Sequence, residues 1–245
     1  MKKHRLTEEY TKAFRAFLDH TTEKRDLFVA LRRRIKAARA RSLLDIGAGN
    51  GDLAIPLRAL VTTYLAIEPK PDFAAKLRAS GINIINSSFP CNFHGRFDVA
   101  LASHVVPWET DESEAFLTAA WDRVSPGGRF IMITYDEEVS DWGKLLQASG
   151  LPLPAVGQGH LDSYKRLLAR CGTLDVEPIV THVATESLGD MLLALSFVYG
   201  DGQPEKAAAF QENETVRHML EIRYHSNGRY RFPFTHYLLH TAKDR

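Results

Sequence analysis

The sequence predicts an α/β fold in which helices cover both faces of a seven-stranded, mostly parallel β-sheet. Two observations lead to this prediction. From Ser42 onward, short apolar runs alternate with amphipathic stretches, which is the pattern of a parallel sheet with crossover helices. The first apolar run leads directly into a glycine-rich turn, and open α/β sheets bind ligands at such turns. We therefore expect a ligand site at the carboxyl end of the first strand.

The predicted strands are short apolar runs bounded by turn residues. They are Ser42 to Ile46, Tyr64 to Glu68, Asn83 to Ile85, Phe97 to Ala102, Arg129 to Thr134, Leu174 to Ala184 and Phe234 to His240. Between the fourth and fifth strands, residues 113–124 carry apolar side chains at helical spacing, and Ser125 to Gly128 form the turn that follows. Later helices are expected over residues 141–148 and 161–171.

We expect one domain over residues 1–245. Residues 1–41 form a helical lid, whose last helix buries Leu27, Leu31 and Ile35 at a spacing of four. Residues 42–136 form the cofactor-binding core. Residues 137–245 complete the sheet and include a helical insertion, residues 186–225, which is longer than a simple crossover needs and is expected to cover the carboxyl edge of the sheet.

Composition narrows the class of partner. The chain has 44% hydrophobic and 25% charged residues, and 31 lysines and arginines balance 30 acidic residues, so no strong net charge attracts nucleic acid or an anionic membrane. The longest apolar stretch, Met191 to Tyr199, is too short to span a bilayer. Only Cys91 and Cys171 are present, which favours a reducing compartment. We expect a cytoplasmic protein with a small-molecule partner.

The glycine-rich turn carries the strongest chemical signal. Gly47, Gly49 and Gly51 follow a buried strand and precede an apolar-periodic helix, and glycines allow the backbone to approach a ligand closely. The dinucleotide fingerprint requires its third glycine where Asp52 stands here, which counts against NAD and FAD.

Two carboxylates flank this turn. Asp45 lies two residues before Gly47, where it can fix the loop and face the cationic methionine portion of S-adenosylmethionine, whereas a pyrophosphate would be repelled. Glu68 follows Gly47 by 21 residues, at the end of the second strand, where both ribose hydroxyls can donate to it. The pattern predicts S-adenosylmethionine as the cofactor.

These residues resemble the Rossmann-like class I methyltransferase family. The stretch Asp45-x-Gly47-x-Gly49-x-Gly51 is similar to its first motif, and the stretch from Ser125 to Phe130 is similar to the turn before its fifth strand. The resemblance covers roughly residues 42–136. It implies that Ser87, Ser88 or Phe89 flanks the adenine and that Ala102 and Ser103 lie beside the methionine portion.

A narrower resemblance concerns the acceptor. Residues 10–23 and 140–145 look like segments of the histamine N-methyltransferase family, whose amino-terminal glutamate, matched by Glu23, binds the amine or imidazole of the substrate. Pocket residues of that family that follow strand four correspond here to His104, Pro107 and Trp108, so a small amine or nitrogen heterocycle other than histamine is expected. Glu23 and Trp108 are the predicted substrate-binding residues. His104 is the predicted general base, because an imidazole with a pKa near 6.5 accepts a proton at neutral pH.

Other acceptors and cofactors are less well matched. The segment after strand four lacks the tetrad of DNA amino-methylases and the acidic ligands of metal-dependent catechol methylation. On one strand, His236 and His240 would lie about 13 Å apart, so no metal is predicted. Three alternatives stay open: a non-catalytic S-adenosylmethionine-binding protein, a small-molecule O-methyltransferase, and an RNA methyltransferase that would use the basic residues between Arg32 and Arg41.

Overall fold

The computed structural model describes residues 8–107, 110–135, 140–151, 160–199 and 203–244. Contacts within the chain divide it into two compact units. The sheet unit consists of Lys24–Tyr135, Gly159–Ile179 and His236–Arg245. The helical unit consists of Met1–Glu23, Asp136–Gln158 and Val180–Thr235. Each unit is described by itself.

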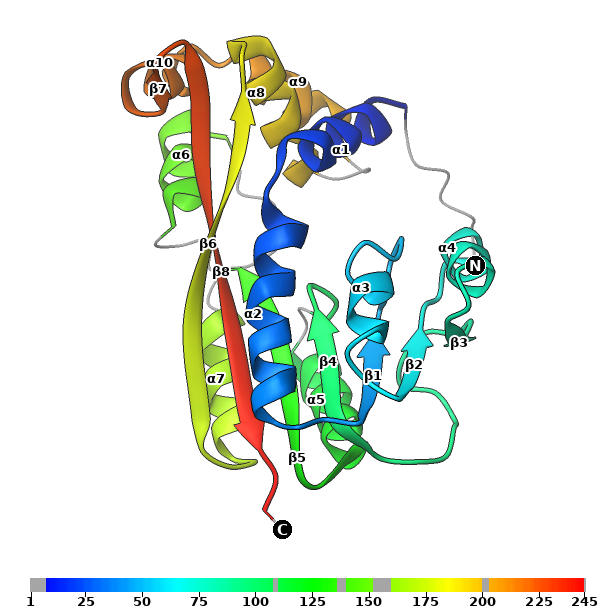
Figure 1. Ribbon diagram of the computed structural model, residues 1–245. Helices are drawn as coiled ribbons and strands as arrows, with labels where there is room; N and C mark the ends of the chain where they lie inside the picture. The colour runs from blue at the N-terminus through cyan, green and yellow to red at the C-terminus, as the bar shows by residue number, and fades with distance from the viewer. Residues whose placement is uncertain (1–7, 108–109, 136–139, 152–159, 200–202, 245) are drawn as a thin grey trace. The chain divides into compact units, whose positions relative to one another are not determined.

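The strands form one mixed, mostly parallel sheet with the order β3-β2-β1-β4-β5-β8-β6 (Figure 1). They are β1 (Ser42–Ile46), β2 (Thr63–Ile67), β3 (Asn83–Ile85), β4 (Phe97–Ser103), β5 (Val124–Tyr135), β6 (Leu174–Thr185), β7 (His225–Ser226) and β8 (Arg229–Ala242). Neighbours from β3 to β5 are parallel, β8 pairs with β5 in the antiparallel sense, and β7 pairs only with β8. The predicted fold is confirmed, with seven strands side by side. The boundaries between the two units fall within β6 and β8.

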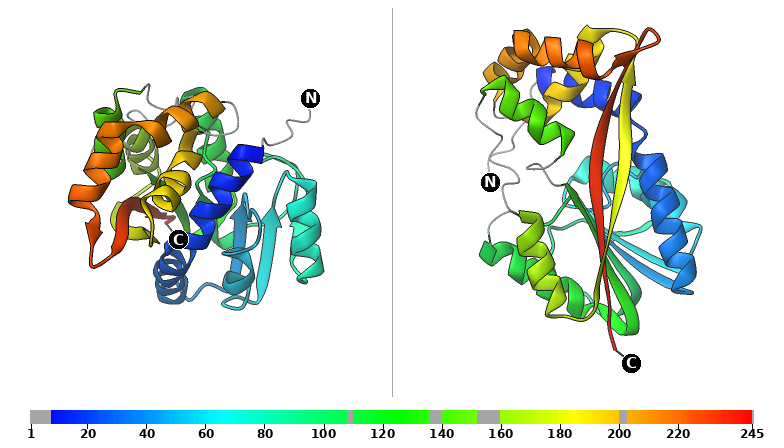
Figure 2. Two further views of the ribbon diagram at one scale, coloured as in Figure 1. Left: turned by 90° about the horizontal axis from the view of Figure 1, so that it is seen from above. Right: turned by 90° about the vertical axis from the view of Figure 1, so that its left-hand side faces the viewer.

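In the sheet unit, successive residues of a strand point to opposite faces, so each face has its own apolar core. One core joins Leu43 and Val99 to α2 (Glu23–Ala37), α3 (Ala54–Arg58) and α4 (Pro71–Ala79). The other joins Leu44 and Ala100 to α5 (Thr110–Asp122) and α7 (His160–Ala169). Figure 2 shows α2 and α7 on opposite sides of the strands. The predicted buried stripe of α2, Leu27, Leu31 and Ile35, is confirmed, because none of these residues is more than 1% exposed.

The helical unit contains α1 (Glu8–His20), α6 (Asp141–Ser149), α8 (Leu188–Leu195), the 3₁₀ helix η1 (Ser196–Tyr199), α9 (Pro204–Glu212) and α10 (Glu214–Arg223). Its core is rich in aromatic rings, including Phe17, Trp142, Phe210, Phe232 and Phe234. Polar side chains cap three of these helices as described: Ser140 accepts a hydrogen bond from Gly143 N, Ser187 accepts one from Asp190 N, and Asn213 accepts one from Val216 N. Among the described residues, no helix has the length and apolar character needed to cross a membrane.

Residues Ser125 to Gly128, which were predicted to form a turn before the fifth strand, belong to that strand. These residues lie inside β5, as an irregularity between the paired residues Phe97↔Val124 and Val99↔Arg129. A Cβ atom at Gly128 would lie 2.8 Å from the carbonyl oxygen of Asp98 on β4. Glycine at this position therefore allows β5 to pack closely against β4 where the regular pairing resumes.

Strand β8 begins earlier than predicted because it is part of a hairpin. Asn227 and Gly228 form the two-residue loop between β7 and β8, and both have positive φ angles, 53° and 73°. An Asn-Gly pair is a typical sequence for this type of turn. The sequence therefore contained a signal for the hairpin that the predicted strand did not include.

Candidate functional site

The glycine turn follows β1 directly and is held against the next strand. The backbone N–H groups of Gly47 and Ala48 both donate to the carbonyl oxygen of Ile67, at 2.8 and 3.2 Å. Gly47, Gly49 and Gly51 all have positive φ angles, 74°, 61° and 97°, which disfavour residues that carry a Cβ atom. The turn therefore requires glycine for its backbone shape at all three positions.

The three glycines differ in what lies beside them. A Cβ atom at Gly47 would lie 2.4 Å from Val105 Cγ1, and one at Gly51 would lie 3.1 Å from Leu77 Cδ2. At Gly49 a Cβ atom would meet no protein atom within 4 Å. Protein packing thus accounts for Gly47 and Gly51, while Gly49 alone borders open space that a ligand can occupy.

Glu68 immediately follows β2 and links it to the glycine turn. Its carboxylate accepts hydrogen bonds from the backbone N–H groups of Gly49, at 2.9 Å, and Lys70, at 2.8 Å. Glu68 is 4% exposed. A residue that the sequence prediction missed, Asn86, donates to the carbonyl oxygens of Glu68 and Pro69, at 2.8 and 3.1 Å. Only its place after β3 could have indicated this role.

Asp45 lies in β1 under the turn, and its carboxylate is buried. It accepts a hydrogen bond from the hydroxyl of Tyr64 on β2. The pKa of the Asp45 carboxyl is raised to about 6. Burial and the charge of Glu68 raise this pKa, and together they outweigh the Tyr64 hydrogen bond and the charge of Lys24, which lower it. The sequence prediction missed Tyr64, since a tyrosine in a strand is ordinarily a packing residue.

The other predicted cofactor residues lie after β3 and at the end of β4. Ser88 is exposed, and the partly buried ring of Phe89 packs edge-on against Phe116, with ring centroids 5.0 Å apart. Ser103 ends β4, and among the described residues its buried Oγ has no hydrogen-bond partner. An unsatisfied buried hydroxyl calls for a polar partner, which a ligand at this edge can supply.

His104 follows β4 with a left-handed φ of 57°. Its backbone N–H donates to the carbonyl oxygen of Ile133, at 2.9 Å, which ties the residue to β5. The imidazole stacks on the ring of Tyr135, with centroids 4.2 Å apart and planes inclined by 19°. The ring of His236 from β8 lies edge-on, 5.2 Å from the His104 ring. Neither Tyr135 nor His236 was predicted as a site residue.

The structure describes only one of the two predicted substrate-binding residues. Glu23 is the first residue of α2, belongs to the helical unit, and is 2% exposed. Its backbone N–H donates to Thr21 Oγ1 at 3.1 Å. Trp108 lies outside the described residues. The structure thus gathers Asp45, the three glycines, Glu68, Ser88, Phe89, Ser103 and His104 in the sheet unit.

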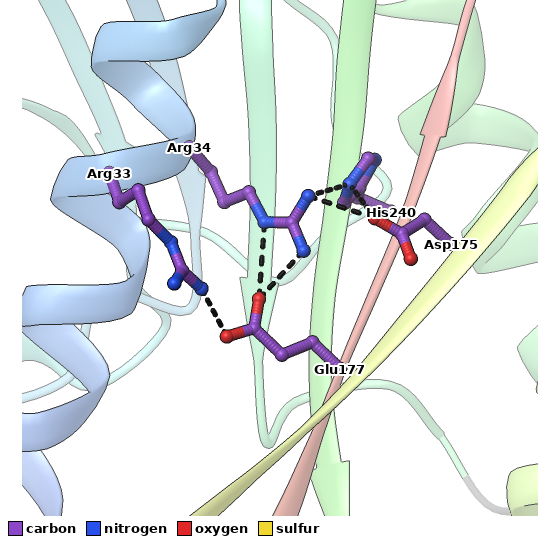
Figure 3. A network of polar contacts seen from close by, with 5 residues as sticks. All are labelled: Arg33, Arg34, Asp175, Glu177 and His240. Carbon is purple, nitrogen blue, oxygen red and sulfur yellow. Dashed lines mark hydrogen bonds and ion pairs between the residues drawn. The ribbon is translucent and has the colours of Figure 1, made fainter.

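The basic run in α2, which could have served an RNA substrate, is partly neutralised (Figure 3). Arg33 and Arg34 both pair with Glu177, and Arg34 Nη1 lies 2.8 Å from Asp175 Oδ2 and 2.5 Å from His240 Nε2. These contacts join α2 to β6 and β8 within the sheet unit. They also place His240 in a different neighbourhood from His236, which packs against His104 and Tyr135.

The residues at the carboxyl edge fit an adenosine ligand with a cationic tail. Gly49 leaves open space for this ligand, and the Glu68 carboxylate lies at the end of β2. The Asp45 carboxylate lies in β1 before the glycine turn, and Ser103 Oγ lies at the end of β4. Each carboxylate oxygen of Glu68 accepts one N–H and retains capacity for a further donor such as a ribose hydroxyl.

Comparison with known families gives one match that covers most of the chain. A family model described as a methyltransferase domain matches residues 9–172. A curated relative, the ubiquinone biosynthesis O-methyltransferase of Methylobacterium nodulans, is 34% identical over 106 residues. The match covers 39% of this chain and 41% of that protein, so the chain spans about two fifths of the length of this relative.

Solved structures share the fold at low sequence identity. The N-methyltransferase NodS from Bradyrhizobium japonicum, in complex with S-adenosyl-L-homocysteine, matches with a TM-score of 0.56 and 11% identity over 98% of this chain and 100% of that chain. The YcgJ protein from Bacillus subtilis matches with a TM-score of 0.56 and 14% identity over 86% of this chain and 97% of that chain.

Proposed function

The chain belongs to the methyltransferase domain family, whose cofactor is S-adenosylmethionine, and on this premise we propose that it methylates a nitrogen atom of a small amine or nitrogen heterocycle. The observation that supports the proposal is the position of His104. His104 is the first residue after β4. The residue that follows it, Val105, fills the space beside Gly47 in the glycine turn. A proton acceptor is thereby held next to the predicted cofactor site.

We assign the cofactor contacts to five residues. Gly49 borders the open space of the turn, Glu68 accepts from the ribose hydroxyls, and Asp45 and Ser103 serve the methionine portion. The Phe89 ring, supported by Phe116, flanks the adenine. When bound, S-adenosylmethionine supplies a methyl group on a positively charged sulfur, which an attacking nitrogen displaces.

The protein itself must position the acceptor and remove one proton from the acceptor nitrogen. An acceptor nitrogen that attacks the methyl carbon must first be neutral, so the imidazole of His104 takes the proton that a protonated amine carries. Glu23, by its resemblance to a substrate-binding glutamate, attracts a cationic amine. Alignment of nucleophile and methyl group in a pocket that excludes water contributes several kcal/mol.

Oxygen methylation is the second candidate, because the curated relative with 34% identity is named an O-methyltransferase. In that case the same imidazole would take the proton of a hydroxyl group.

A cofactor-turnover assay with small amines, imidazoles, phenols, carboxylates and RNA distinguishes the candidates by formation of S-adenosylhomocysteine. We expect turnover with amines or imidazoles. The His104→Asn variant should lower kcat by roughly 10²- to 10⁴-fold with cofactor affinity retained. Turnover with phenols alone would establish a small-molecule O-methyltransferase. Turnover with RNA would establish an RNA methyltransferase. Cofactor binding without any turnover would indicate a non-catalytic binding protein.

Glu23 has a separate test. Glu23→Gln should raise KM for a cationic amine and leave the cofactor dissociation constant unchanged, which titration of each ligand measures. Equal losses for both ligands would mark Glu23 as a structural residue of α2.

A further inference from the structure

We infer that the methyl acceptor is a planar aromatic molecule, which stacks on a wall of three ring side chains formed by His104, Tyr135 and His236. The inference rests on the proposed methyl transfer and names the acceptor class of that same site. The term ring wall refers to these three residues below.

The sheet brings the three rings together from separate strands. Tyr135 ends β5 and lies opposite His236 on β8, while His104 follows β4, the neighbour of β5 on its other side. Ring centroids are 4.2 Å apart for His104 and Tyr135, 4.9 Å for Tyr135 and His236, and 5.2 Å for His104 and His236. All three residues belong to the sheet unit, so the register of its strands sets this arrangement.

The ring wall adjoins the cofactor turn. The end of β4 pairs with the end of β1, with Ala102 opposite Ile46, so Ser103 and His104 extend alongside the glycine turn. Val105, the residue after His104, is in contact distance of Gly47. An acceptor on the ring wall therefore lies at the edge of the sheet where the methyl group is expected.

Burial differs among the three rings. His236 is 0% exposed, whereas His104 and Tyr135 are half-buried and keep part of their surfaces accessible. The planes of His104 and Tyr135 are inclined by only 19°, so these two rings form a stacked pair, whereas the ring of His236 is inclined by 62° to that of His104. A buried ring that supports two partly accessible ones is suited to hold a flat ligand.

The backbone at His104 supplies independent support. A left-handed φ of 57° is uncommon for residues with a side chain, and such conformations persist where the surrounding structure imposes them, often at functional sites. Here the conformation turns the chain immediately after β4 while the imidazole packs against Tyr135. The conformation thus keeps this ring in the wall.

A flat aromatic acceptor gains stacking contacts that a saturated ring of equal size cannot make. Each such ring contact is expected to raise the affinity of the protein for the acceptor by about 2- to 10-fold. The matched probes are benzylamine and cyclohexylmethylamine, which are both primary amines and differ in the aromaticity of the ring. Benzyl alcohol and cyclohexylmethanol form the corresponding oxygen pair.

The experiment measures binding of each probe to the full chain loaded with S-adenosylhomocysteine, by calorimetry, and methyl transfer to each probe with S-adenosylmethionine. We expect the aromatic member of a pair to bind about 2- to 10-fold more tightly. Tyr135→Leu should abolish this preference and Tyr135→Phe should keep it, with the affinity for S-adenosylhomocysteine unchanged in both. Tyr237→Leu is the matched control, because Tyr237 neighbours His236 on β8 but points to the opposite face of the sheet.

The outcomes separate the two proposals. Equal binding of aromatic and saturated probes, binding of neither, or a preference that survives Tyr135→Leu would overturn the ring wall. An aromatic preference that depends on Tyr135, with no methylated product from any probe, would support the ring wall and count against the proposed methyl transfer. Equal methylation of both members of a pair would support methyl transfer alone.

Discussion

Gly49 borders space that the protein leaves open, whereas the equivalent spaces at Gly47 and Gly51 are filled by side chains. The difference matters because all three glycines occur in one short motif and look alike in sequence. A ligand can approach the backbone only where no protein atom stands in the way, which singles out Gly49.

A substitution at Gly49 tests this point. Gly49→Val should abolish cofactor binding in calorimetry, because its side chain would occupy the open space and its backbone would be strained at a φ of 61°. Gly81→Val is the matched control: Gly81 also has a positive φ, 74°, and open space at Cβ, but it precedes β3 at the other edge of the sheet. Retained affinity in a folded Gly49→Val variant would remove the assignment of the cofactor site.

The buried carboxyl of Asp45 gives the apo protein a distinct pH dependence. Its pKa rises from 3.8 to about 6, chiefly because of burial, so the folded protein holds this proton more tightly than the unfolded chain. The free energy of unfolding therefore falls as the pH rises between these two values, and is lower by on the order of 3 kcal/mol at neutral pH than at pH 4 from this group alone.

The Asp45→Asn variant should lack this component. Denaturant unfolding of the apo protein between pH 4 and pH 7.5 should give a flatter pH dependence for the variant than for the wild type. Cofactor affinity of the wild type should also decline as the pH falls below about 6, because a protonated Asp45 no longer attracts a cationic tail. Parallel stability curves for the two proteins would show that Asp45 does not titrate in this range.

At the scale of elements, helix α2 is held to β6 and β8 by the network around Arg34. The side chain of Arg34 is 20% exposed, and it contacts Glu177, Asp175 and His240, whereas that of Arg33 is 61% exposed and contacts Glu177. Burial opposes the ionised form of Glu177, but hydrogen bonds from Arg34 and Arg33 lower its pKa overall. Hydrogen bonds to charged, partly buried groups contribute more than exposed ion pairs.

Substitution of the two neighbouring arginines should separate these contributions. Arg34→Met should lower the free energy of unfolding by about 1–3 kcal/mol. Arg33→Met should lower it by less than about 1 kcal/mol. Chemical denaturation of both variants measures the difference. Equal losses would mean that the number of contacts and the burial of Arg34 have no bearing on the stability of this network.

At the scale of the whole molecule, the predicted cofactor residues from Asp45 to Ser103 all belong to the sheet unit, while the helical unit has a separate aromatic core. Local opening of one unit therefore need not follow opening of the other. A ligand slows hydrogen exchange chiefly where its binding opposes local opening.

Hydrogen exchange with and without S-adenosylhomocysteine tests this division. At a ligand concentration of about 100 times Kd, amides of residues 47–52 should exchange up to about 100-fold more slowly. Amides of α10 in the helical unit should exchange at unchanged rates. Equal protection across both units would show that the ligand opposes opening of the chain as a whole.

Much of the fold could be predicted because local sequence patterns determine it. The apolar runs marked the strands, and the spacing of Leu27, Leu31 and Ile35 marked the buried stripe of α2. The family followed from the glycine turn and its place after β1. The bulge in β5 and the start of β8 were mispredicted, because strand pairing sets where a strand irregularity or a hairpin lies.

The sequence by itself determined the sheet, the family and the cofactor, because these depend on residue periodicity and on a motif of adjacent residues. Only the tertiary structure decided that Tyr64 reaches Asp45, that Val105 fills the space beside Gly47, and that Tyr135 and His236 meet His104. These partners lie on different strands, and their contacts depend on strand order and register. A one-residue change of register would turn each side chain to the other face of the sheet.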